Sequence, residues 1–140
     1  MDFTQLNNDL LSLIEKRNLL LTLNYNDDNY DEVEDDLHEK EDNFVENHGE
    51  ALEDILGDVH EELNIDTDVL LPTAYIPKKF IEDEKEDSFE IDANDGVLIE
   101  SDEIPNKNTR LVLVPNPTRI IFIVDGQLNR IAWSSENSMA

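Results

Sequence analysis

The chain has 140 residues, of which 35 are acidic and 10 basic, so its formal net charge at pH 7 is −25. A chain of this length suits one domain, and we expect residues 1–140 to form it. A field of this sign repels nucleic acid and anionic lipid, and it attracts cations and basic protein surfaces. Cysteine is absent, which excludes disulfides and thiolate metal sites.

The first residues of the chain lack the basic segment and apolar run of a signal peptide. The longest uninterrupted aliphatic or aromatic run, residues 120–124, is far shorter than a membrane span. We therefore expect a cytoplasmic protein with no membrane partner.

Apolar residues recur at intervals of three and four near the N-terminus, which is typical of one face of an α-helix. This stripe consists of Phe3, Leu6, Leu10, Leu13, Ile14, Leu20 and Leu21, with Arg17 on the same face. It predicts a helix over about residues 4–22, capped by Asp2 or Thr4. Turn-forming residues follow at 24–29, so a second helix would complete an αα-hairpin.

Residues 27–63 carry 17 acidic residues against one base, Lys40, so the formal charge of this segment is −16. An apolar stripe at helical spacing runs through it: Tyr30, Val33, Leu37, Phe44, Leu52, Ile55, Leu56, Val59 and Leu63. We expect one acidic amphipathic helix or two in series. The stripe weakens at Lys40 and Glu41, and Gly49 disfavours a helix interior. These features favour a break or kink near Gly49.

Beyond a hinge at residues 64–73 the pattern changes from helical to strand-like. The expected strands are 75–81, which Pro77 interrupts, and 88–91, 97–100, 109–114, 118–124 and 128–133. Asp125 and Gly126 predict a hairpin turn, and a second is expected at 94–96 between strands 88–91 and 97–100. The predicted fold class is α+β. An acidic helical hairpin of two to three helices (residues 1–64) packs on an antiparallel sheet or small open barrel of four to six strands (residues 73–135).

The two parts differ in charge. Residues 105–135 hold one acid, Asp125, and four bases, Lys107, Arg110, Arg119 and Arg130, which gives +3. Either the strand arginines lie across the acidic helices within one fold, or the basic part forms an interface with another copy or another protein. The run at residues 120–124 is apolar on both faces, and on this ground we expect a homodimer.

His38 has carboxylates at helical spacing, with Glu34 and Asp42 four residues away and Asp35 three away. Divalent metals accept such ligands. In so acidic a segment, however, these spacings arise by chance, and we predict neither a metal site nor a cofactor.

The function expected from the sequence is a non-enzymatic acidic interaction module that binds a basic protein partner. Inhibitor or immunity proteins, nucleic-acid mimics and adaptors remain open within that class. The alternative is a metal-dependent, hydrolase-like enzyme that uses the acidic helices around residues 50–58 with His38 or His60. No catalytic residue is assigned. The candidate partner-binding residues are Asp31, Glu32, Glu34, Asp35, Asp36, Glu39, Glu46, Glu50, Glu53 and Asp54.

Overall fold

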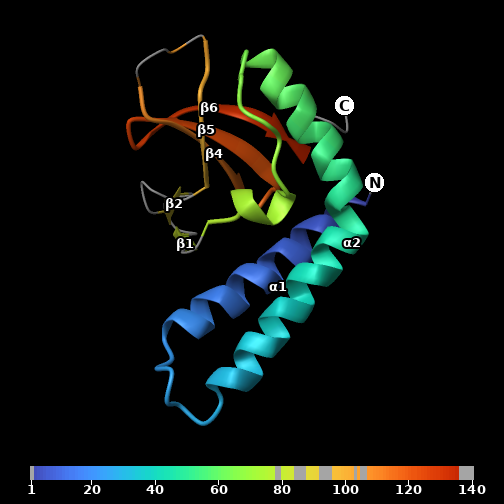
Figure 1. Cartoon of the computed structure of the whole chain (residues 1–140), viewed down its shortest axis with the longest axis vertical. Helices are drawn as coiled ribbons and strands as arrows, with labels where there is room; N and C mark the ends of the chain where they lie inside the picture. The colour runs from blue at the N-terminus through green and yellow to red at the C-terminus, as the bar shows by residue number, and fades with distance from the viewer. Residues whose placement is uncertain are drawn as a thin grey trace.

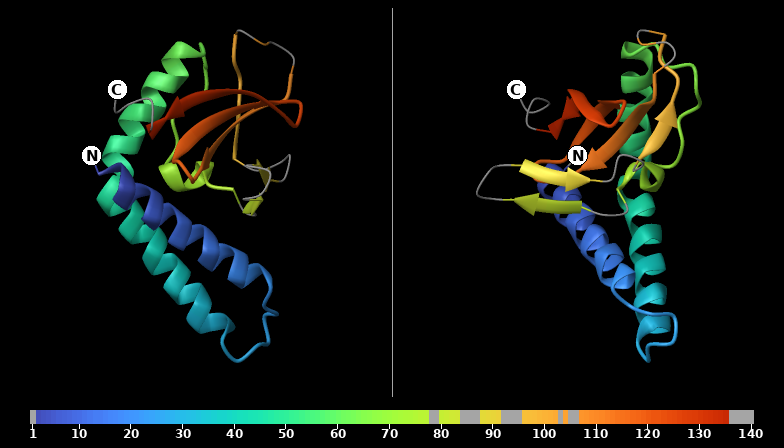
Figure 2. Two further views of the ribbon diagram at one scale, coloured as in Figure 1. Left: turned by 180° about the vertical axis from the view of Figure 1, so that it is seen from behind. Right: turned by 90° about the vertical axis from the view of Figure 1, so that its left-hand side faces the viewer.

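The computed structural model describes residues 2–77, 80–83, 88–91, 96–102, 104 and 107–135 of the chain. Two long helices come first and β-strands follow, so the fold class is α+β, as predicted (Figure 1). In chain order the elements are α1 (Phe3–Leu21), α2 (Tyr30–Glu62), the 3₁₀ helix η1 (Pro72–Tyr75), β1 (Phe80–Asp83), β2 (Ser88–Ile91), β3 (Val97–Ile99), β4 (Thr109–Val114), β5 (Arg119–Val124) and β6 (Gln127–Ser134). The helical hairpin extends away from the sheet (Figure 2).

Helix α1 begins at the cap that the sequence indicates. The side chain of Asp2 accepts a hydrogen bond of 3.0 Å from the backbone N–H of Gln5, which satisfies one of the amides left over at a helix N-terminus. The buried residues of α1 are Leu6, Leu10, Leu13 and Ile14, all members of the predicted stripe.

Helix α2 is one continuous helix of 33 residues, so the predicted break near Gly49 is wrong. Figure 1 shows instead that α2 changes direction in its middle, which agrees with the expected kink. The half before the bend lies beside α1, and the half after it lies beside the sheet (Figures 1 and 2). His48 and Gly49 are buried, and His48 Nε2 donates a 2.7 Å hydrogen bond to the carboxylate of Asp9 in α1. This tertiary contact offsets the weak helix preference of the local sequence.

Two ion pairs also join the antiparallel helices. Lys16 Nζ lies 2.7 Å from Asp36 Oδ2, and a guanidinium nitrogen of Arg17 lies 3.5 Å from Glu41 Oε2. Arg17 in addition donates a 3.2 Å hydrogen bond to the carbonyl oxygen of Ile76, just after η1. Arg17 therefore connects both helices to the segment that leads into the strands.

Strands β3, β4, β5 and β6 form an antiparallel sheet in that order, and β1 pairs with β2 in a separate two-stranded sheet. The bounds of β4, β5 and β6 agree with the predicted strands to within one residue. Asp125 and Gly126 form the two-residue turn between β5 and β6, with positive φ angles of 49° and 82°. Such angles match the twist of a hairpin, and Gly reaches them without strain.

Two strand predictions are wrong. Residues 72–75 form η1 rather than the start of a strand at residue 75, and Pro72 suits the first turn of such a helix. The expected hairpin between residues 88–91 and 97–100 does not form, because β2 pairs with β1 and β3 pairs with β4. Asn94 and Asp95, expected in its turn, lie outside the described residues. Gly96 serves another purpose, since a Cβ there would collide with the carbonyl oxygen of Leu111 in β4.

The apolar run that suggested a homodimer is buried within the chain. Residues 120–123 of β5 and 111–114 of β4 are all buried, so both faces of these strands are covered. They share one core with the buried residues of α1, with Leu52 and Leu56 of α2, and with Tyr75 of η1. The homodimer stays a prediction, but the exposed seam that motivated it is absent from these two strands.

Side chains of α1 fasten the hairpin to the sheet. Asn7 Oδ1 accepts hydrogen bonds from the backbone N–H of Asn116 at 2.8 Å and from the hydroxyl of Thr118 at 3.1 Å. The rings of Phe3 and Trp133 lie 5.9 Å apart between centroids. In the part of the chain that the structure describes, no helix combines the length and apolar character needed to cross a membrane. The cytoplasmic location stays a prediction.

Candidate functional site

The ten predicted partner-binding carboxylates all lie on α2, and we call them the acidic face. Eight of them are exposed to solvent: Asp31, Glu32, Asp35, Glu39, Glu46, Glu50, Glu53 and Asp54. Glu34 and Asp36 are half-buried. The alternation of charge and apolar residues places them there, because Val33, Leu37 and Phe44 turn inward at helical spacing and leave the other angles to the acids. Along the helix the acidic face extends roughly 35 Å, at about 1.5 Å per residue.

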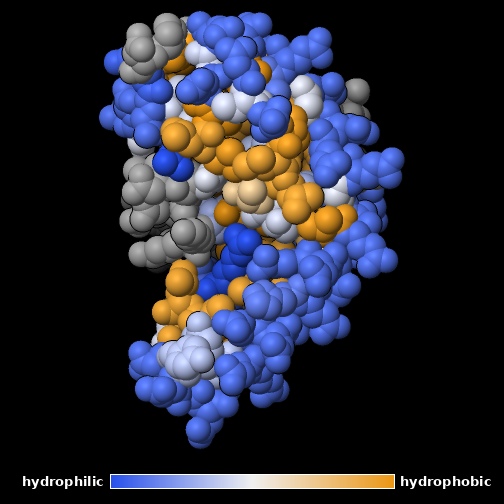
Figure 3. All heavy atoms as spheres, viewed as in Figure 1, coloured by the Kyte–Doolittle hydropathy of each residue, from blue (hydrophilic) through white to orange (hydrophobic). Residues whose placement is uncertain are grey.

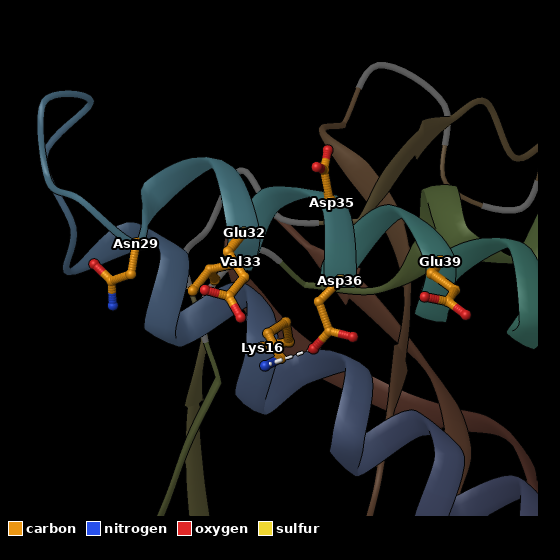
Figure 4. A pocket seen from close by; sticks show the side chains of 7 residues that line it. All are labelled: Lys16, Asn29, Glu32, Val33, Asp35, Asp36 and Glu39. Atoms are coloured by element: carbon orange, nitrogen blue, oxygen red, sulfur yellow. Dashed lines mark ion pairs between the residues drawn. The ribbon is translucent and has the colours of Figure 1, made fainter.

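The first turns of the acidic face line a hollow beside α1, shown in Figure 4. Its lining residues are Lys16, Asn29, Glu32, Val33, Asp35, Asp36 and Glu39. Asp36 points toward Lys16, whereas Asp35 points away from α1 (Figure 4). Four carboxylates and one ammonium group thus line the hollow, which keeps a negative charge.

Lys16 holds the pKa of the Asp36 carboxyl below its usual range, chiefly through their hydrogen bond. The carboxylate of Asp36 is therefore charged throughout the physiological range and is partly neutralised by its own chain. Both side chains are partly exposed to solvent, so the pair contributes little to stability. Its consequence is that Asp36 is less available to an external cation than the acids farther from α1.

The histidines do not converge with the carboxylates of the acidic face. His38 is exposed on α2, His48 is bonded to Asp9 and packed against Phe44 at 5.3 Å between ring centroids, and His60 is buried near the end of the helix. Within the described ranges, no three His, Cys, Asp or Glu side chains are arranged to hold a metal ion. The ligand set considered around His38 is not assembled among these residues.

A polar cluster that the sequence analysis missed surrounds His60. Its Nδ1 donates to the carbonyl oxygen of Thr67 at 3.1 Å, and its Nε2 lies 3.3 Å from the hydroxyl of Tyr75. That hydroxyl also accepts a 3.1 Å hydrogen bond from the backbone N–H of Leu70. Burial lowers the pKa of His60 and raises the pKa of Tyr75, since burial penalises the charged form of each. One signal for the cluster was present, because His60 follows Leu56 by four residues and so falls on the apolar stripe.

The strand arginines have contacts close to their own strands. Arg119 donates to the backbone carbonyl oxygens of Pro115, Asn116 and Pro117 at 3.1 to 3.4 Å, which ties together the loop between β4 and β5. The guanidinium of Arg130 lies 5.5 Å from the ring centre of Phe122 on the neighbouring strand, within the range of a cation–π contact. Local roles of this kind account for part of the positive charge of the sheet.

Two further carboxyl groups lie together where α2 gives way to the strands. The backbone N–H of Asp66 donates to the carbonyl oxygen of Glu100, and that of Asp102 donates to the carbonyl oxygen of Asn64, both at 3.0 Å. These bonds hold the two carboxyls near each other. Their hydrogen bond and mutual repulsion raise the pKa of Asp102. Together with Glu100 they line a hollow of about 340 Å³.

Comparison of the chain with protein-family models, with curated proteins and with solved structures returned no match.

Proposed function

We propose that this chain is a non-enzymatic interaction module that binds a basic surface of another protein through the acidic face of α2. The observation that supports this proposal best is the direction of the carboxylates, eight of ten being exposed to solvent. Those on the half of α2 before the bend lie on the part of the hairpin that extends away from the sheet, where a partner can reach them (Figure 2). Long-range attraction between such a surface and a basic partner raises the association rate and weakens as salt is added.

A metal-dependent hydrolase would need carboxylates that converge around a cation. The residues named for that alternative, Glu50, Glu53, Asp54 and Asp58, are exposed on α2. Both ring nitrogens of His60 are within hydrogen-bonding distance of partners in the fold. The interaction module therefore explains more of the observed geometry than the enzyme does.

The decisive experiment measures association kinetics. A partner is first isolated from source lysate on the immobilised chain at low salt and then purified. The test variant carries Asp31→Asn, Asp35→Asn, Glu39→Gln and Glu46→Gln, all at exposed positions. Stopped-flow mixing should show an association rate about tenfold lower at low salt, and the difference should vanish when high salt screens the charges.

A matched control keeps the charge and changes only side-chain length, by exchanging Asp for Glu and Glu for Asp at the same four positions. Its association rate should equal that of the wild type. The amide variant should be at least as stable as the wild type, because like charges four residues apart on a helix repel each other. An amide variant that unfolds, or that associates at the wild-type rate, would contradict the proposal.

A further inference from the structure

Residues 67–71, which lead from α2 to η1, expose three aliphatic side chains in succession. Val69, Leu70 and Leu71, which we call the apolar strip, are all exposed, with Leu70 at 46% and Leu71 at 57%. Figure 3 shows hydrophobic side chains gathered on this face of the molecule, over the segment that joins α2 to η1. Exposed apolar groups that adjoin one another are unfavourable in water and commonly mark an interaction site.

The backbone beneath the strip is held by the His60 cluster. The carbonyl oxygen of Thr67 accepts from His60, the N–H of Leu70 donates to Tyr75, and the carbonyl oxygen of Leu71 accepts from the N–H of Ala74 at 2.9 Å. The apolar side chains are thus displayed on an anchored segment rather than on a loose loop. A surface that is already ordered loses less conformational entropy when a partner binds.

Carboxylates border the strip. The exposed acids that directly precede it in the chain are Asp66 and Asp68, and backbone hydrogen bonds of residues 64 and 66 bring Asp102 and Glu100 beside Asp66. The chain forces Asp66 and Asp102 together although both are acids, and a cation placed between them would relieve their repulsion. Among the described residues that line the same hollow, the base is Lys107, whose Nζ lies 3.6 Å from a carboxylate oxygen of Asp125. The acids at the border of the strip therefore keep a net negative charge, which would attract a basic group of a partner.

We propose that the apolar strip binds an amphipathic helix of a partner protein, whose aliphatic face covers Val69, Leu70 and Leu71 and whose flanking lysines or arginines meet the acidic border. This inference rests on the proposed function, since it adds an apolar anchor to the binding of a basic partner. The backbone of Leu71 is extended, with φ −61° and ψ 143°. In extended backbone the first and third of three residues lie about 7 Å apart between their Cα atoms, which is close to the spacing of i, i+4 side chains along one turn of a helix. A second copy of this chain is a poor occupant, because each copy carries a net charge of −25.

The test uses a fluorescein-labelled leucine–lysine peptide of about four helical turns, with its leucines on one face. Fluorescence anisotropy should show binding to the wild-type chain, and the double variant Leu70→Ser, Leu71→Ser should bind about tenfold more weakly or worse. The matched control is Leu19→Ser, Leu21→Ser at the end of α1, where the leucines are exposed to a similar degree, 42% and 64%. This control should bind the peptide as the wild type does. Circular dichroism checks that both variants remain folded.

Each of the following peptide results would overturn the inference: equal weakening in both double variants, no weakening in the Leu70 and Leu71 variant, or equally tight binding of a peptide with serine in place of leucine. A dimer in sedimentation that the Leu70 and Leu71 changes dissociate would assign the strip to a second copy and also overturn it. The amide variant of the acidic face separates the two proposals. If that variant associates normally with the isolated partner while the strip variant loses the peptide, the proposed function fails and the strip still stands as a site.

Discussion

Replacing His60 with Phe tests the cluster that holds the end of α2 to η1. His60 is only 6% exposed and Tyr75 is 0% exposed, so water has little access to the hydrogen bonds between them. Because the carbonyl oxygen of Thr67 can only accept, His60 Nδ1 carries the proton and Nε2 accepts from the hydroxyl of Tyr75. Phe keeps a ring of similar size there, which stays beside Tyr75, but it removes both hydrogen bonds.

The expected loss follows from the two groups left behind. Thr67 is half-buried, so its carbonyl oxygen can be rehydrated in part, whereas the hydroxyl proton of Tyr75 has no acceptor in a site closed to solvent. A buried polar group without a partner costs about 1–3 kcal/mol, and a lost hydrogen bond about 1 kcal/mol. His60→Phe should therefore lower the free energy of unfolding by about 2–4 kcal/mol. Adding Tyr75→Phe to His60→Phe removes the hydroxyl that was left without an acceptor. The double variant should therefore lose about 1 kcal/mol or more less free energy of unfolding than the sum of the two single losses.

The pH dependence of stability carries a second signature. The folded-state pKa of His60 lies below its usual value of 6.5, so between the two values the unfolded chain binds a proton that the folded chain does not. Stability from this group is complete above 6.5 and is lost as the pH falls toward the folded-state pKa, with a slope of at most about 1.4 kcal/mol per pH unit. The Phe variant lacks this component, so its deficit relative to wild type should shrink in acid.

Urea denaturation followed by circular dichroism, at about pH 8 and again at about pH 5, measures both quantities. His38→Gln is the matched control, since His38 is exposed on the same helix and its replacement should change stability by less than about 0.5 kcal/mol. A His60→Phe chain as stable as the wild type at about pH 8 would refute the assigned hydrogen bonds, and one with the wild-type pH dependence would contradict the lowered pKa of His60.

Two further predictions concern charged groups. Arg17→Met removes the hydrogen bond to the carbonyl oxygen of Ile76 and an ion pair with α2, and should lower the free energy of unfolding by about 1.5–3 kcal/mol, whereas Lys16→Met should cost about 0.5 kcal/mol or less. Equal losses in urea denaturation would contradict this difference. The pKa of Asp102 is raised, so its stability contribution is present at low pH and is lost as the pH rises through that pKa. Asp102→Asn should therefore raise the melting temperature at neutral pH and not in strong acid, and a lower melting temperature at neutral pH would contradict the repulsion from Asp66.

Local signals predicted the elements whose preferences and tertiary contacts agree. In α1 the cap at Asp2 and the leucine stripe both predict the same helix. At Asp125 and Gly126 the turn signal lies between two β-branched runs, so turn and strand signals predict the same hairpin. Strand pairing at a distance was not predictable in the same way. Gly96 gave a turn signal, but the fold uses this glycine for the close approach of β3 to the carbonyl of Leu111. A residue suited to two backbone roles does not reveal from sequence which one it serves.

The candidate sites likewise differ in whether local sequence spacing or only the tertiary structure reveals them. Exposure of Asp35 or Glu39 follows from amphipathic spacing alone, so the acidic face was predictable to a large extent. The apolar strip lies outside any periodic segment, and only the tertiary structure shows that Leu70 and Leu71 remain uncovered. The His60 cluster joins residues up to 15 positions apart, and no local pattern places Tyr75 against α2.

Each helical stripe is interrupted by a charged residue, and the two charged residues pair with each other. Arg17 takes an apolar position in α1, Glu41 falls where the stripe of α2 weakens, and the two side chains form an ion pair at 3.5 Å. An apolar pair at that level would bury more surface, but it would also permit the helices to slide by a turn, whereas a pair of opposite charges favours one register. The hydrogen bond between Asp9 and His48 acts at the bend in the same manner. Glu41 and Asp9 thus align the two helices of the hairpin, and partner binding is therefore expected from the outward acids of α2 and not from Glu41.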